Sequence, residues 1–432
     1  MCDEAGTRGR SIMRRSAGVL CVFVVLLMCA APVIAQQDLE GGAPGIDAKR
    51  GKPNTYEAIP VGPFLFTPAI QLNYQYRDNI FFTPDDPVSD SVWMARARLQ
   101  FELPINESYI LFAYTPQYRD YVDYELDDKW SHFVDVLGGF EFSNGLLINA
   151  TYKYMEGNLE NREVDPGGEL FWGDRWYKKN YAAVQLSYWA TPKNGFNIEA
   201  DYTDLKHEDP DLWYDYERYI IGAGWLHQLS EILVMNLAYR RTEFKPSENL
   251  FFDNEFREST SDEITLGFRG MINPVLKTEI VVGYRKTAYN IPPEAEGIIP
   301  DFDGFIAKGY INWSMGHGSS LRLDLLRSDY PSNFGINANY VATGASLQYQ
   351  YEKNRFRAQA RGRYQVNDYA VPDLLTGLDR EDPIKTVGLG LGYRFGPFVS
   401  LWGGYLYENR DSTIYRYSYD YSVYTLSLVV GY

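Results

Sequence analysis

Residue types that could carry out chemistry are sparse and scattered in this 432-residue chain. The four histidines stand far apart: His132, His207, His227 and His317. All three cysteines precede residue 30: Cys2, Cys21 and Cys29. Their spacing matches no metal-binding pair, and the chain has no glycine-rich phosphate loop and no nucleophile elbow. Ser131 beside His132 lacks a third catalytic partner. We therefore expect no enzyme activity, no metal site and no cofactor.

Arginines at alternating positions form the clearest chemical pattern. One short stretch carries four of them: Arg355, Arg357, Arg361 and Arg363. Six more occupy equivalent positions in other alternating segments: Arg96, Arg98, Arg240, Arg269, Arg285 and Arg322. In a strand, positions two apart face the same side, so these arginines would line one surface.

Two interpretations of these arginines stay open. If they line a pore, they favour an anionic solute or polymer, as arginine rings do in channels. Alternatively, they pair with inward carboxylates and stiffen the wall. The candidate partners are Glu102, Glu199, Asp201 and Asp324.

Strand-like alternation positions these residues and dominates the chain from Phe64 onward. For example, Leu321, Leu323 and Leu325 share one face, whereas Arg322 and Asp324 share the other. We expect eighteen such strands. They lie near 64–77, 91–103, 108–121, 130–142, 145–157, 178–191, 195–206, 215–228, 232–244, 260–272, 275–289, 302–315, 319–330, 338–352, 355–368, 383–395, 398–409 and 419–432. Each is longer than the roughly 9–11 residues with which a tilted strand crosses a bilayer.

The connections between these segments alternate strictly between short turns and longer polar loops. This asymmetry is typical of outer-membrane barrels, which have tight periplasmic turns and long external loops. The sequence therefore predicts an all-β fold, a transmembrane antiparallel up-and-down β-barrel of about 18 strands with both termini periplasmic. The external connection near 158–177 is long enough to fold over the mouth or into the lumen. Aromatic residues near strand ends, Trp402 among them, suit the two membrane interfaces.

The last strand explains how the barrel would close. Its apolar face carries Tyr424, Leu426, Leu428, Val430 and Tyr432, which we interpret as a C-terminal assembly signal read by the outer-membrane assembly machinery. Pairing of this strand with the first one would remove both edges of the sheet, as any sheet in lipid requires.

The region before the barrel divides into two parts. Residues 1–35 have a basic start at Arg14 and Arg15, an apolar run over 17–31 and small residues before Gln36, which predicts a cleaved signal peptide. Residues 36–62 are rich in Gly, Pro and charge and are expected to be a flexible periplasmic segment, followed by the barrel at 63–432. The predicted location is the outer membrane of a Gram-negative bacterium. The net charge of −16 argues against nucleic-acid binding.

One stretch of the first strand resembles a known family. The segment 72–84 reads LNYQYRDNIFFTP, in which Tyr76, Asp78, Asn79, Ile80 and Phe81 are similar to an early Tyr-x-Asp-Asn-hydrophobic-Phe segment. This segment resembles the opening of the putative β-barrel porin 2 family of Gram-negative outer membranes. The resemblance implies a single-chain barrel that is often associated with exopolysaccharide synthesis and export. It also implies periplasmic export proteins as partners beside the membrane lipid, and it supplies no catalytic residues.

Three functions follow from these observations. The first is an outer-membrane exit conduit for a secreted polysaccharide. The second is a general or solute-specific diffusion porin, which the same barrel would serve. The third is a scaffold or receptor whose lumen is plugged by loops.

Overall fold

The strands of the computed structural model form one continuous antiparallel sheet. The structure describes residues 58–125, 129–158, 169, 176–208, 214–247, 255–291, 300–333, 337–373 and 375–431. The strands are β1 (Ile59–Val61), β2 (Phe64–Arg77), β3 (Asp90–Ile105), β4 (Ser108–Tyr121), β5 (Trp130–Glu141), β6 (Leu146–Asn158), β7 (Trp176–Trp189), β8 (Asn194–His207), β9 (Tyr216–Ser230), β10 (Leu233–Pro246), β11 (Ser259–Asn273), β12 (Leu276–Tyr289), β13 (Phe302–Gly316), β14 (Ser319–Pro331), β15 (Asn339–Lys353), β16 (Phe356–Tyr369), β17 (Glu381–Arg394), β18 (Val399–Arg410) and β19 (Tyr419–Gly431). Two 3-10 turns accompany them, η3 (Glu255–Arg257) and η5 (Tyr415–Tyr417).

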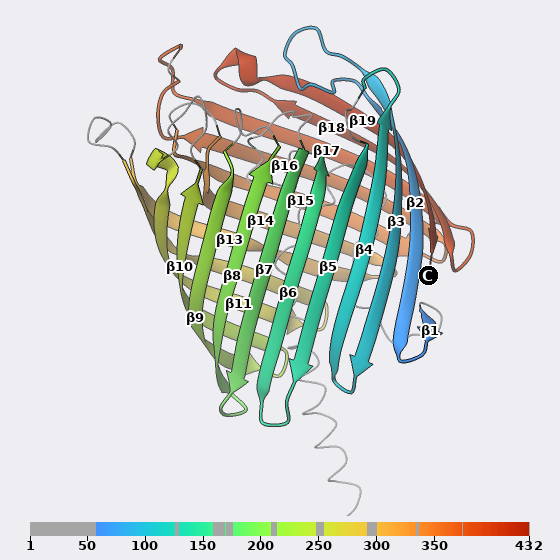
Figure 1. Cartoon of the computed structure of the whole chain (residues 1–432), viewed down its shortest axis with the longest axis vertical. Coiled ribbons are helices and arrows are strands. Elements are labelled where there is room, and N and C mark those ends of the chain that lie inside the picture. Colours follow the sequence, from blue (N-terminus) through green and yellow to red (C-terminus); the bar gives the residue numbers. More distant parts are fainter. Residues whose placement is uncertain are drawn as a thin grey trace, which may run out of the picture.

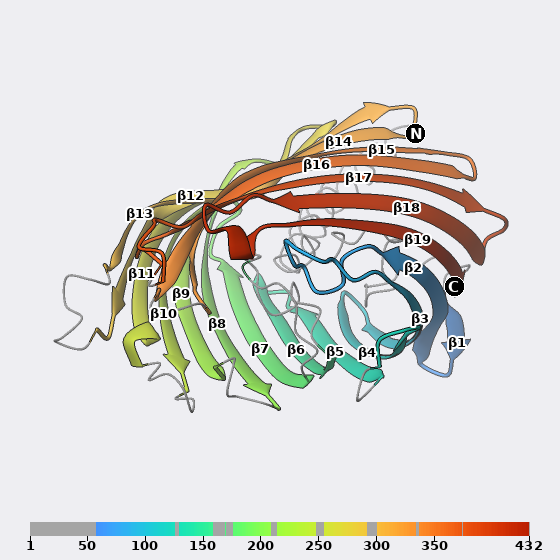
Figure 2. The same ribbon diagram turned by 90° about the horizontal axis from the view of Figure 1, so that it is seen from above.

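The sheet closes on itself. Each strand from β2 onward pairs with the next, and β19 returns to pair with β2. At this seam Tyr424 lies opposite Tyr76 and Leu428 lies opposite Leu72. Figure 2 shows the strands curving around a common axis until the last lies beside the first. The predicted eighteen-strand antiparallel barrel, closed by its last strand, is therefore confirmed, with β1 as an additional short strand.

The two faces of the wall differ as the alternation predicts. Outward positions carry exposed apolar side chains, such as Trp93 and Leu426, whereas the positions between them carry buried polar ones, such as Gln100 and Ser427. A single-residue slip would exchange these faces, so the pattern also fixes the register. Within the described residues, no helix is both long and apolar enough to span a membrane.

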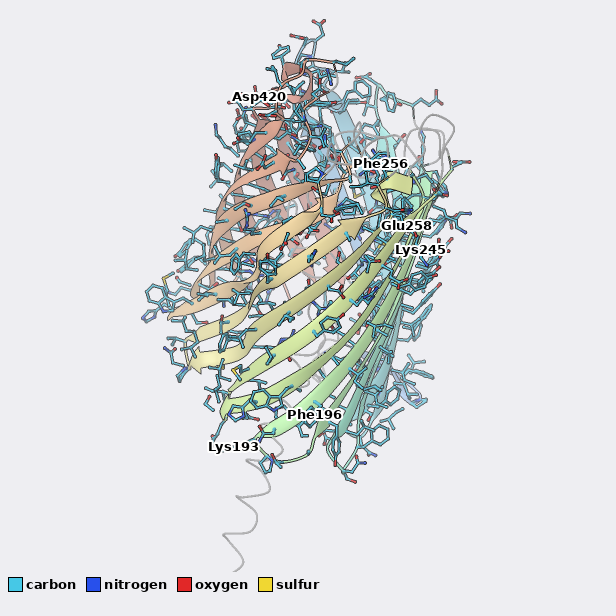
Figure 3. All side chains as sticks on the ribbon, turned by 90° about the vertical axis from the view of Figure 1, so that its left-hand side faces the viewer. Lys193, Phe196, Lys245, Phe256, Glu258 and Asp420 are labelled. Carbon is cyan, nitrogen blue, oxygen red and sulfur yellow. The ribbon has the colours of Figure 1, made fainter. Side chains whose placement is uncertain are left out.

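The connections differ between the two ends of the barrel (Figure 1). At one end, here called the turn end, short turns join the strands, and several turn residues have a positive φ, including Asn106, His317 and Asn354. His317 lies between two glycines, and a Cβ at Gly318 would meet the carbonyl oxygen of Glu352 at 1.7 Å. The other end, here called the loop end, carries the long connections. Figure 3 shows Lys193 and Phe196 near the turn end and Phe256 near the loop end.

One element departs from the expectation for the N-terminal segment. Residues 59–61 fall within the part expected to be flexible, but they form β1 and pair with Phe64–Phe66 of β2. They use the same edge of β2 on which β19 pairs with Ala69–Arg77. The predicted signal peptide lies outside the described residues, as does Tyr432 of the C-terminal signal.

Candidate conducting lumen

The structure places nine of the ten candidate arginines at inward positions of the wall. Their outward neighbours, such as Tyr239, Ile264 and Tyr284, are exposed apolar side chains on the opposite face. The nine are Arg96 and Arg98 on β3, Arg240 on β10, Arg269 on β11, Arg285 on β12, Arg322 on β14, and Arg357, Arg361 and Arg363 on β16. Arg355 differs, because β16 begins at Phe356 and Arg355 lies exposed in the preceding turn. There it donates a hydrogen bond of 3.4 Å to the carbonyl oxygen of Phe395.

A chain of ion pairs crosses the wall from β8 to β14. Arg240 contacts Glu199 at 2.5 Å and Glu263 at 2.6 Å. Arg285 contacts the second oxygen of Glu263 at 2.5 Å and Asp329 at 2.6 Å. Thr287 donates a hydrogen bond of 2.9 Å to the remaining oxygen of Asp329. Such charges are stable away from water only when both partners and their hydrogen bonds are present.

A glycine allows this chain to pass over a strand. Glu199 and Arg240 belong to β8 and β10, and Gly222 of β9 lies opposite both of them. A Cβ at Gly222 would stand 2.7 Å from Oε1 of Glu199. The missing side chain therefore leaves the space in which the carboxylate and the guanidinium meet.

Two further arginines pair with carboxylates on the same strand or on the adjacent one. Arg269 contacts Glu279 at 2.5 Å, and Arg322 contacts Asp324 at 2.7 Å. The guanidinium of Arg322 also lies 4.0 Å from the centre of the Tyr310 ring. Together with Arg240 and Arg285, these side chains have the paired arrangement that was one of the two interpretations.

The inner wall around β16 has a different composition. Arg357, Arg361 and Arg363 lie opposite Gly392, Gly388 and Thr386 of β17. On the other side, Arg361 and Arg363 face Gln348 and Ser346 of β15. The positions paired with Arg361 and Arg363 therefore hold an amide, hydroxyls and a glycine, whereas Arg357 lies opposite the carboxylate of Glu352 at the end of β15.

Trp402 lies inside the barrel, so its expected place at a membrane interface is wrong. It is buried, and a Cβ at Gly390 or Gly392 would come within 2.1 Å or 2.5 Å of its ring. The two glycines therefore leave room for the indole to lie flat against β17. The guanidinium of Arg357 is 5.7 Å from the ring centre. On β3, Arg96 is likewise 5.7 Å from the ring centre of Phe133.

Connections at the loop end converge on Ser332, just after β14. Glu169 belongs to the connection between β6 and β7, yet its Oε1 accepts a hydrogen bond of 2.5 Å from Ser332 Oγ. Its Oε2 accepts one of 2.7 Å from the backbone N–H of Asn333. The carbonyl of Ser332 accepts hydrogen bonds from Tyr214 at 3.2 Å and from Arg257 at 2.9 Å. Burial lowers the pKa of the Arg257 guanidinium, whereas Tyr214 and Glu169 act in the opposite sense.

Glu169 also contacts the wall opposite its own strands. Its carbonyl accepts a hydrogen bond of 3.0 Å from Arg410 of β18. In the closed strand order, the stretch β14–β18 lies across the barrel from β6 and β7. The expected inward course of the connection near 158–177 can be followed only at Glu169, because the other residues of that connection lie outside the described ranges.

A second charged group near the loop end was not among the candidates from the sequence. Arg380 and Arg410 contact Asp382 at 2.7 Å and 3.1 Å, and all three are buried. The Arg380 guanidinium lies between the rings of Tyr369 and Tyr417, 4.1 Å and 3.6 Å from their centres. Asp382 lies at the start of β17 and Arg410 at the end of β18. The alternation of these strands places both residues on the inward face, and this was the only indication that the sequence held.

The candidate catalytic and metal groups do not come together. Ser131 is buried on the inner face. His132 lies on the outer face, where its Nδ1 forms a hydrogen bond of 2.8 Å with the hydroxyl of Tyr114. In the part of the chain that the structure describes, no group of three His, Cys, Asp or Glu side chains could hold a metal ion.

Comparison with known families gives one match. The model of the family described as putative beta-barrel porin 2 matches residues 236–432, which include most of β10 and all of β11–β19. The resemblance to this family is therefore confirmed for the C-terminal part of the barrel. The matched range does not include the 72–84 segment on which the resemblance was first based. No curated protein matches this chain.

Several solved structures are similar to this chain at low sequence identity. OccAB3 of Acinetobacter baumannii is 12% identical, with 86% of this chain and 100% of that chain covered and a TM-score of 0.49. OpdK of Pseudomonas aeruginosa is 11% identical, with 85% and 99% covered and a TM-score of 0.47. OpdO of the same organism is 11% identical, with 87% and 98% covered and a TM-score of 0.48. The barrel described above rests on its own strand pairing and not on these similarities.

Proposed function

Because residues 236–432 match the putative β-barrel porin 2 family and the chain closes into a porin-type barrel, we propose that this protein is an outer-membrane exit conduit for a secreted polysaccharide. The family and the fold point to a channel and not to an enzyme. The polymer is the part of the proposal that goes beyond the match. It rests on the resemblance stated above and on the chemistry of the inner wall.

The observation that carries the proposal is the strip of inner wall formed by β15–β18. Its inward positions combine cationic groups (Arg357, Arg361), amides (Gln348) and an indole (Trp402) across neighbouring strands. Amides and guanidinium groups donate hydrogen bonds to hydroxyl and carboxylate oxygens, which are the groups that a polysaccharide presents.

Partners of the conduit follow from its two ends. Periplasmic export proteins would contact the short turns or the segment 36–62, and the outer-membrane assembly machinery would act on the C-terminal strand. The exposed apolar outer face, such as Leu389 and Leu391, would contact membrane lipid.

A second candidate is a diffusion porin for small anionic solutes. The position of Glu169 supports it, because the contacts with Ser332 and Arg410 place this residue of the β6–β7 connection against the opposite wall at the loop end. A barrel whose lumen is plugged by loops would instead fit a scaffold or receptor without transport.

A deletion strain separates these candidates. Loss of surface polysaccharide with intact intracellular synthesis supports the conduit, and slower growth on one small anionic solute supports the diffusion porin. The variant Arg357→Ala/Arg361→Ala/Arg363→Ala should reproduce the deletion defect if β16 contacts the polymer. Arg355→Ala is the matched control, because this arginine lies in the turn. Normal export in the triple variant would contradict the assigned role of β16.

A further inference from the structure

Lys308 of β13 faces the lumen. It lies opposite Val281 of β12, on the same face of that strand as Arg285. On the same strand, Phe305 points outward and is exposed. Ile306, two positions before Lys308 and on the same inward face, is 3% exposed. The charged groups that act on Lys308 are Arg285, Glu263, Asp329 and Arg240, which all belong to the inner wall. The alternation of the 302–315 segment already places Lys308 on the inward face, although it was not among the candidate residues.

The side chain of Lys308 is exposed, unlike the paired arginines around it. Among the residues that the structure describes, no carboxylate lies within ion-pair distance of its ammonium group. Its neighbours at paired inward positions are apolar, Val281 on one side and Leu326 on the other. The stem therefore lies on an apolar patch, and the ammonium group extends into the lumen.

The acidic groups near Lys308 are already engaged. Glu263 receives Arg240 on one oxygen and Arg285 on the other, at 2.6 Å and 2.5 Å. Asp329 receives Arg285 and Thr287. Both carboxylates are buried, at 4% and 7% exposure. A solute passing this wall can therefore contact the ammonium group of Lys308, whereas the carboxylates of Glu263 and Asp329 are buried in the wall.

We propose that Lys308 is a selectivity-determining residue of the channel and that it binds anionic groups, carboxylate or phosphate, of the permeating solute. The inference deepens the proposed function and rests on it in one respect, which is that the lumen conducts. The four paired arginines hold the wall together, and Lys308 presents its charge to the solute. Removal of this charge leaves the buried carboxylates less compensated, so the local preference shifts toward cations.

The test uses a single engineered thiol. No cysteine follows Cys29, so Lys308→Cys places the only thiol in residues 36–432. The variant is reconstituted in planar bilayers, and the anion-to-cation permeability ratio is measured from reversal potentials in a salt gradient. The thiol is then modified with a cationic or an anionic methanethiosulfonate. Lys193→Cys, in a turn at the far end of β7 (Figure 3), is the matched control.

We expect the permeability ratio to fall about fivefold in Lys308→Cys. This factor corresponds to ~1 kcal/mol, the interaction of two unit charges about 4 Å apart in bulk water. The cationic reagent should restore the ratio, and the anionic reagent should lower it further. A purely structural role of Lys308 would not give opposite effects with the two reagents. Lys193→Cys should leave the ratio unchanged with either reagent.

Two results would overturn the inference. One is a ratio that stays the same in Lys308→Cys before and after modification. The other, decisive even for a barrel that carries no current, is a labelling rate at Lys308→Cys less than about a tenth of that at Lys193→Cys. Neither depends on the polymer, so a strain that exports polysaccharide normally without this protein would refute the conduit and leave the role of Lys308 standing.

Discussion

Ser332 donates a hydrogen bond of 2.5 Å to Glu169, a residue 163 positions earlier in the chain that belongs to a different connection at the loop end. The same carboxylate accepts the backbone N–H of Asn333, and both Glu169 and Ser332 are fully buried. Hydrogen bonds to an ionised carboxylate are about twice as strong as those between neutral groups. This contact therefore holds Glu169 against the end of β14.

Replacement of this carboxylate should widen the loop end. In Glu169→Ala both hydrogen bonds are lost, each a charged contact of roughly 1.5–3 kcal/mol. We expect a larger single-channel conductance with more frequent transitions between levels. Glu208→Ala, an acidic residue at the end of β8 whose side chain is not part of this cluster, is the control. Equal conductance in Glu169→Ala and the parent would show that the contact does not limit the pore.

The ion-pair chain should matter for stability. Arg285→Ala removes contacts to Glu263 and Asp329 and leaves two buried carboxylates short of a partner, which typically costs about 3–5 kcal/mol. Arg241→Ala removes an exposed contact of 3.4 Å to Asp262 and should cost less than about 1 kcal/mol. Urea unfolding in lipid vesicles, followed by tryptophan fluorescence, measures both. Similar losses in the two variants would contradict the special role of the buried chain.

Gly222 should tolerate no side chain. In Gly222→Ala the new Cβ would stand 2.7 Å from Oε1 and 2.9 Å from Cγ of Glu199, so the carboxylate must leave Arg240. We expect a loss of about 1–3 kcal/mol, as for other overpacked sites. Gly403→Ala, where nothing lies within 4 Å of the new atom, is the matched control and should unfold at the same urea concentration as the parent. A smaller effect at Gly222 than at Gly403 would argue against the bridging role of this glycine.

The connection between β16 and β17 should respond to acid. Burial of Asp373 opposes its ionisation, but hydrogen bonds from Thr376 and the nearby Arg416 outweigh burial and lower the pKa of this carboxyl. A lowered pKa gives stabilisation that is complete above the ordinary carboxyl value of about 3.9 and is lost as the pH falls through the lower folded value.

Hydrogen exchange of the Leu375 and Thr376 amides, corrected for the intrinsic rate, measures this loss. Protection should stay constant between pH 7 and about 5 and fall only in stronger acid. Asp373→Asn should be less protected throughout and should lose the pH dependence. If protection already declines near neutral pH, another group controls the connection.

The strands and the faces of their residues could be predicted from the sequence, whereas the partners of the charged residues could not. Alternation fixes which face a residue occupies, so the inward positions of Arg240 and Glu199 follow from local pattern alone. Their contact depends on the register of three strands and on a glycine in the middle one, which no single segment reveals. Trp402 shows the same limit, because its place depends on Gly390 and Gly392 of the neighbouring strand. Glu169 is bound by groups on the opposite wall, which a sequence pattern cannot locate.

The small strand β1 limits how far the last strand can pair along β2. Gly62 and Pro63 join β1 to β2, so this hairpin is local in sequence and can form within microseconds, before the far strand arrives. It occupies the edge of β2 at Phe64–Phe66, and the last described pair of β19 joins Gly431 to Ala69. Only Thr67 and Pro68 of this edge lie between the two pairings, so β19 has little room to shift toward the start of β2. The stagger between the first and last strands is linked to the tilt and width of a barrel, and this three-residue arm limits the stagger in one direction.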